Sequence, residues 1–170
     1  MLGLTSLGIV HTAISLVAVI AGARQLIREG AISPERRTGK VYVWFTIATC
    51  ITGFGIFQHG GFGKPHALGV ITLITLAVAG LARRGWVFGR LARYVATVGY
   101  SLSFFFHMVP ALTETFTRLP AGRPLFTSPE DPTLQALDGL CFLLFLAGAT
   151  VQVLRLRARG RRTAPGRMAA

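Results

Sequence analysis

Five long apolar runs, separated by short polar or basic segments, dominate the pattern of this chain. They cover about residues 4–27, 41–59, 66–82, 95–117 and 133–154. Runs of roughly 18–20 apolar residues are long enough to cross about 30 Å of hydrocarbon as α-helices. No Lys, Arg, Asp or Glu interrupts 65–82 or 95–113. The pattern therefore predicts an all-α integral membrane bundle of five transmembrane helices over residues 1–154, followed by a basic tail at 155–170.

The segments between the runs carry signals for helix ends. Pro65 suits the first turn of a helix, because its missing N–H has no partner there anyway. Asp131 followed by Pro132 has the pattern of an N-cap residue and a proline at the first helical position. Residues 83–94 read RRGWVFGRLARY. Alternating basic and aromatic residues of this kind are typical of a segment lying at a membrane surface.

Charge sets the expected orientation. The chain is 52% hydrophobic and 14% charged, with a net charge of +12. Lys64, Arg118 and Arg123 fall on one side of the threaded chain, and the other fifteen of the 18 basic residues fall on the opposite side. The positive-inside rule then places the N-terminus outside and the C-terminus in the cytoplasm, as in a multi-pass protein of a bacterial inner membrane. Because membrane topology explains the positive charge, we expect no nucleic-acid partner.

Four histidines lie on the outer side of this threading. His11 and His107 are roughly 10 and 15 Å below the outer surface, counted at about 1.5 Å per residue. His59 ends the second run and His66 begins the third, so a short Gly- and Pro-containing turn brings the two together. An imidazole in hydrocarbon is costly and usually ligates a metal or haem, relays a proton or bonds between helices.

Two carboxylates accompany the histidines. Glu114 follows His107 by seven residues, almost two full turns, so both share one face of the fourth helix. Asp138 lies near the outer start of the fifth helix. Glu114 and Asp138 are therefore candidate members of a proton relay.

These groups favour membrane redox chemistry at a single b-type haem. Neutral imidazoles from two facing helices can ligate the iron axially, and the deeply placed His11 and His107 are the expected pair. His66 is the substitute ligand, and His59 could meet a haem propionate or a quinol. Glu114 or Asp138 could accept quinol protons. Quinone or a periplasmic redox protein would then be the electron partner, in addition to the lipid bilayer.

Three alternatives stay open. Copper, zinc or iron without haem could be bound by His11, His107 and His66 converging from separate helices. The His and Glu residues could instead relay protons in a transporter. In the third alternative, the imidazoles only form hydrogen bonds between helices, each contributing about 1 kcal/mol of stability, and the chain is an accessory or structural subunit. Neither an enzymatic reaction nor an oligomeric state follows from the residues.

Two stretches carry a resemblance to a known family: ERRTGKVYV at 35–43 and FFHMVPALTETFTRLPAGRPL at 105–125. They resemble an uncharacterised family of bacterial multi-helix inner-membrane proteins that is catalogued as a domain of unknown function. Members typically place a His in the first helix and another at the start of the third, matching His11 and His66. Their inner loops often carry His-Arg motifs, where this chain has Glu35-Arg36-Arg37 and Arg83-Arg84.

The bundle is also loosely similar in architecture to the membrane cytochromes b. The two-haem members of that group carry histidines in both leaflets. This chain has no inner set of histidines, so the resemblance implies one haem at most.

Overall fold

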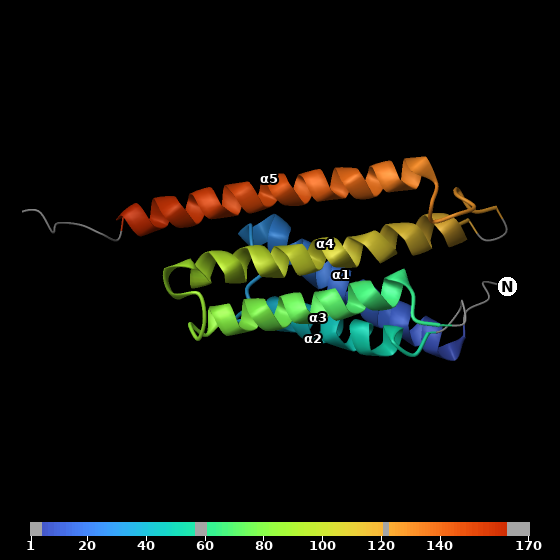
Figure 1. Cartoon of the computed structure of the whole chain (residues 1–170), viewed down its shortest axis with the longest axis horizontal. Helices are drawn as coiled ribbons and strands as arrows, with labels where there is room; N and C mark the ends of the chain where they lie inside the picture. The colour runs from blue at the N-terminus through green and yellow to red at the C-terminus, as the bar shows by residue number, and fades with distance from the viewer. Residues whose placement is uncertain (1–4, 57–60, 121–122, 163–170) are drawn as a thin grey trace, which may run out of the picture.

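The computed structural model describes residues 5–56, 61–120 and 123–162, which form a helical bundle without strands in these ranges (Figure 1). The helices are α1 (Ser6–Glu29), α2 (Arg37–Gly53), α3 (Lys64–Arg83), α4 (Ala92–Arg118) and α5 (Pro132–Arg162). A short 3₁₀ turn, η1 (Gly89–Leu91), leads into α4. The predicted all-α class is therefore confirmed.

Four of the helical segments in the described ranges are long and apolar enough to cross a membrane: Ser6–Glu29, Lys64–Arg83, Gly89–Arg118 and Pro132–Arg161. The second predicted span, 41–59, differs most from the structure. Helix α2 starts at Arg37 and ends at Gly53, because the chain turns through Phe54 and Gly55. Its 17 residues extend about 25 Å, less than the roughly 30 Å of a hydrocarbon core.

The other helix ends follow local chemistry. The Thr5 hydroxyl accepts a hydrogen bond from the Gly8 N–H at 3.1 Å and caps α1. Pro65 lies in the first turn of α3, as predicted. The Thr133 N–H donates to Asp131 Oδ1 at 2.8 Å, which confirms the predicted cap of α5. Helix α5 continues to Arg162, beyond the expected end at 154, because Leu and Arg are good helix formers.

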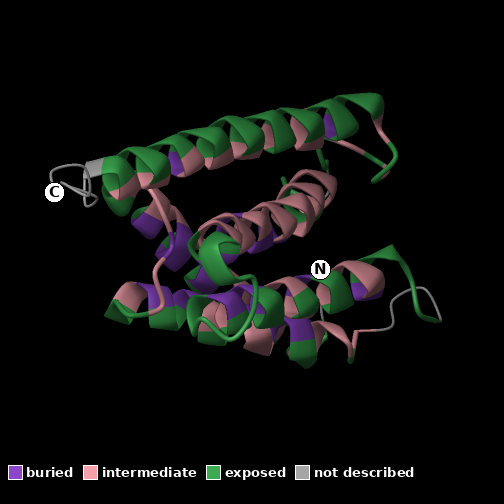
Figure 2. Ribbon diagram, turned by 60° about the vertical axis from the view of Figure 1, so that its left-hand side comes forward, coloured by how far each residue is buried: buried purple, intermediate pink, exposed green. Residues whose placement is uncertain are grey.

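Helices α1 to α4 form a closed ring in chain order, since each contacts the next and α4 contacts α1. Helix α5 lies outside this ring, along α4 (Figure 1). It is exposed over most of its surface, as the green ribbon in Figure 2 shows. We call the end where α1 begins the proximal end and the end where α1 finishes the distal end. The connection from α3 to α4 is at the distal end.

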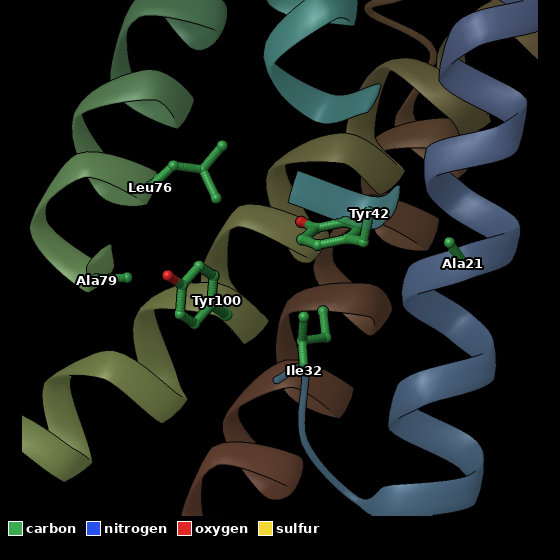
Figure 3. Close-up of a cluster of buried hydrophobic side chains, with 6 residues drawn as sticks. All are labelled: Ala21, Ile32, Tyr42, Leu76, Ala79 and Tyr100. Atoms are coloured by element: carbon green, nitrogen blue, oxygen red, sulfur yellow. The ribbon is translucent and has the colours of Figure 1, made fainter. Parts of the chain in front are cut away.

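The packed centre of the ring combines small residues with two tyrosines (Figure 3). Ala21 and Ala79 are buried on α1 and α3, and they leave room for the rings of Tyr42 and Tyr100. The Tyr42 hydroxyl is fully buried and lies 2.7 Å from Ser103 Oγ. This bond joins α2 to α4, and small residues with interhelical hydrogen bonds are the usual means by which membrane helices associate.

A polar contact fixes α5 to the ring near the distal end. Gln152 Nε2 donates to the Gly30 carbonyl at 2.8 Å, and the Gln152 amide also bonds the Ser101 hydroxyl. Gly30 ends α1 with a φ of 73°, a left-handed conformation in which a β-carbon would be strained. The long helix α5 is thus positioned by one buried amide in addition to its packing on α4.

Candidate functional site

A cavity of about 350 Å³ lies between α1, α2, α3 and α4 in the proximal half of the ring. Its volume is within the range of about 300–1,000 Å³ that is typical of small-molecule sites. Four ionisable side chains predicted from the sequence line it: His11, His66, His107 and Glu114. The bundle therefore gathers residues from three separate helices around one space.

His11 reaches the cavity from the second turn of α1. Its Nδ1 lies 3.0 Å from the hydroxyl of Thr52 on α2. That hydroxyl has a single proton, which it donates to the carbonyls of Ala48 and Thr49. The Thr52 oxygen therefore accepts from His11, so the proton of the neutral imidazole is on Nδ1. The lone pair on Nε2 is then available to a ligand, as in metal-binding histidines oriented by a second residue.

The backbone of α2 allows His11 to lie close. A β-carbon at Gly53 would be 3.2 Å from His11 Cε1. Such a contact is tighter than ordinary packing, so a larger residue at this position would press on the ring. Thr52 and Gly53 together hold the imidazole, one by a hydrogen bond and the other by the absence of a side chain.

His107 is the most deeply enclosed of the predicted ligands that the structure describes. It is buried in the middle of α4, with an exposed fraction of 6%. Its Nε2 has no hydrogen-bond partner among the described residues, and a buried polar atom in that state costs about 1–3 kcal/mol. It lies near enough to His11 for their charges to interact. A ligand in the cavity that bonded to this nitrogen would remove the free-energy cost of its missing hydrogen bond.

His66 has a different role in the structure. Its Nδ1 accepts a hydrogen bond from the backbone N–H of Gly63 at 3.3 Å, at the start of α3. A neutral imidazole that accepts at Nδ1 carries its proton on Nε2. In this form His66 offers a donor to a ligand but no lone pair at Nε2, so it is a weaker candidate for metal ligation than His11.

The two predicted relay carboxylates are placed differently. Glu114 lies at the cavity, forms an ion pair with Arg118 one turn further along α4, and is within electrostatic range of His11. Asp138 is on α5 and does not line the cavity. Because α5 packs outside the ring, the cavity does not bring Asp138 together with the histidines, and its role in a proton relay stays a prediction. His59 lies outside the described residues.

The donor set at the cavity includes two imidazoles on different helices, His11 on α1 and His107 on α4. Two imidazoles on different helices suffice for axial ligation of a haem iron. His11 and His107 are of the residue type that this ligation requires. Among the described residues, no group of three or more His, Cys, Asp or Glu side chains is placed to hold a metal ion. The haem-free copper, zinc or iron centre therefore gains no support from this arrangement.

Two residues that shape the site, Arg118 and Thr52, were not singled out from the sequence as site residues, whereas the run Phe104–Phe106 could by its sequence either line a cofactor or be lipid-facing or packing residues. Arg118 neutralises Glu114, and Thr52 orients His11 without lining the cavity itself. Phe106 is the one member of the Phe104–Phe106 run that lines the cavity. Phe104 packs on Tyr42, and Phe105 stacks on α5. Helix packing is needed to reveal the role of Thr52, since a Thr in an apolar run has no distinctive spacing, and to show which Phe of the run lines the cavity.

No family model matches the chain, and no match was found among curated proteins or solved structures.

Proposed function

We propose that the chain is a redox protein of a bacterial inner membrane that binds one b-type haem in the proximal cavity. The observation that carries the proposal is that two histidines line one cavity: His107, whose buried Nε2 has no hydrogen-bond partner among the described residues, and His11, whose Nδ1 is anchored by Thr52. Such a haem would supply one-electron exchange, with quinone as a candidate partner. Glu114, at the same cavity, is positioned to accept a proton on oxidation of a quinol.

Chain direction supports five membrane passes. Helices α1 and α3 both begin at the proximal end, so α2 must run the length of the ring between them (Figure 1). Although α2 has only 17 residues and begins with the basic segment from Arg37 to Lys40, the run without Lys, Arg, Asp or Glu in the sequence extends from Val41 to His59, which is within the range of about 17–25 residues for a membrane pass. In a topology of five membrane passes with the basic residues on the cytoplasmic side, the proximal end and its cavity face the outside of the membrane.

Topology reporters test this orientation. Fusion of a fluorescent protein to the C-terminus is expected to be bright, and fusion of alkaline phosphatase there is expected to be inactive. Active phosphatase at the C-terminus would contradict the proposed cytoplasmic position of that terminus.

Absorption spectroscopy of the purified protein tests haem binding. We expect a Soret band and, after reduction, sharp α and β bands, all lost in His11→Ala and in His107→Ala. His66→Ala is the matched control and is expected to retain the spectrum. A colourless protein from haem-supplied cells would overturn the proposal, as would a spectrum that survives the His11 and His107 substitutions. Stoichiometric copper, zinc or iron in a colourless protein would instead indicate the haem-free centre.

Proton-coupled transport is a second candidate, favoured by hydroxyl groups that line the cavity beside His11 and Glu114. These belong to Thr12, Ser15, Thr49, Thr72 and Thr115. A hydroxyl-lined path can carry protons between titratable groups. Substrate-dependent proton flux into liposomes by the colourless protein would support transport, and its absence would remove this candidate.

A further inference from the structure

A second hollow, of about 530 Å³, lies at the distal end, far along the bundle from the cavity. It is formed by the connection from α3 to α4 and is lined by Arg83, Arg90 and Arg93. Gly85 and Gly89 have φ values of 74° and 44°, which let the chain turn back on itself between the helices. This turn brings guanidinium groups from both sides of the connection to one concave surface.

The hollow keeps most of its positive charge. Arg83 is paired with Glu35. Arg90 and Arg93 form no ion pair within the described part of the chain. The Arg93 guanidinium lies over the ring of Tyr94, donates from Nη2 to the Tyr94 hydroxyl at 3.0 Å, and lies beside Gly160 of α5. Guanidinium groups bind phosphate through two parallel N–H···O bonds, so unneutralised arginines around a hollow favour a phosphate.

The connection that forms the hollow also carries exposed apolar side chains, here called the rim, which lie between the lining residues in the sequence. Trp86 is 69% exposed, Phe88 50% and Leu91 62%. Trp and Phe side chains of this kind are enriched at the level of lipid headgroups, where an apolar ring meets a polar layer. A free phosphate ion would gain nothing from this rim, whereas a phospholipid would place its acyl chains beside it.

We propose that the hollow lined by Arg83, Arg90 and Arg93 binds the phosphate of an anionic phospholipid. Basic pockets between membrane helices bind such headgroups. Arg90 and Arg93 bind the phosphate, and Trp86, Phe88 and Leu91 contact the upper acyl chains. This site depends on membrane insertion but not on haem, so it stands or falls separately from the function proposed above.

Quenching of Trp86 fluorescence by brominated lipids tests the site. The full-length Trp44→Phe protein leaves Trp86 as the single tryptophan, in neutral detergent with phosphatidylcholine. Brominated phosphatidylglycerol is expected to quench Trp86 at a lower concentration than brominated phosphatidylcholine does. Arg90→Gln is expected to weaken the phosphatidylglycerol effect about fivefold. Arg24→Gln, which removes an exposed charge from α1 outside the hollow, is the matched control and should change nothing.

Several outcomes would overturn the proposal. Equal quenching by the two lipids would do so, as would an equal loss in Arg24→Gln and Arg90→Gln. Replacement of chloride by inorganic phosphate at constant ionic strength should leave quenching unchanged; displacement of the lipid would assign the hollow to free phosphate. Because Arg90 is exposed, its substitution is expected to preserve the fold, and circular dichroism checks this. Arg93→Gln is a second variant in which quenching of Trp86 by brominated phosphatidylglycerol is expected to weaken.

Discussion

His11 Nδ1 and Thr52 Oγ1 are 3.0 Å apart across the α1–α2 interface, although 41 residues separate them in the chain. Because the Thr52 proton is used by the backbone of its own helix, this contact sets which nitrogen of His11 carries a proton. The chemistry available at the cavity therefore depends on a hydroxyl that does not line it.

Replacement of Thr52 by Val should weaken ligand binding without unfolding the bundle. The new side chain keeps the volume but cannot accept from His11, so the imidazole loses its orientation. Loss of such an outer partner typically costs about 10–100-fold in metal affinity. Haem titration of the purified apoprotein measures this. Thr72→Val is the matched control, since the Thr72 hydroxyl lines the same cavity but bonds only its own helix, at Leu68. Equal losses in both variants would contradict the orienting role.

Substitution of Gly53 by Ala should displace His11. The added carbon would lie 3.2 Å from His11 Cε1, so the ring or the helix must shift by a few tenths of an ångström. We expect weaker haem binding and destabilisation on the order of 1 kcal/mol. Gly148→Ala on α5 is the control, because its added carbon would meet no atom within 4 Å. Unchanged stability and an unchanged spectrum in Gly53→Ala would contradict this prediction, because α1 would then move away from the added carbon without cost.

Removal of the Tyr42 hydroxyl should destabilise the bundle modestly. Ser103 Oγ donates to the Tyr100 carbonyl at 2.8 Å, so it accepts from Tyr42. Tyr42→Phe breaks this link between α2 and α4. Interhelical hydrogen bonds in membranes contribute about 0.6 kcal/mol on average and up to about 1.7. A double-mutant cycle with Ser103→Ala, read by denaturation in mixed micelles, isolates the pair. Strictly additive effects of the two substitutions would show that the bond contributes nothing.

The ion pair between Glu35 and Arg83 should make stability depend weakly on acid pH. Partial burial raises the pKa of Glu35, but hydrogen bonds from Ser33 and Arg83 outweigh it and hold the pKa below its ordinary value of 4.5. The stabilisation is therefore present above the unfolded pKa and is lost as the pH falls through the lower folded pKa.

Both side chains of this pair are about half exposed, so screening by water limits the effect to about 0.5 kcal/mol. Comparison of unfolding between about pH 6 and about pH 3 in the natural protein and in Glu35→Gln measures it. A steeper acid slope in Glu35→Gln than in the natural protein would contradict the sign.

The sequence by itself determined the all-helical class and the number and order of the helices, because apolar runs of membrane length and their Pro and Asp boundaries are local properties. It also identified His11, His66, His107 and Glu114, since ionisable groups are conspicuous in apolar runs. Helix ends were predicted less well where glycine intervened, as in α2.

Only the tertiary structure decided which groups act together. It excluded Asp138 from the cavity, because the packing of α5 outside the ring depends on interhelical contacts such as Gln152 with Ser101. It also distinguished three chemically identical histidines. The Thr52 hydroxyl and the Gly63 N–H give His11 and His66 different proton positions. His107 differs from both in being buried in mid-helix, with no hydrogen-bond partner for its Nε2 among the described residues. Such differences arise from neighbours far apart in the chain, and no spacing along a sequence encodes them.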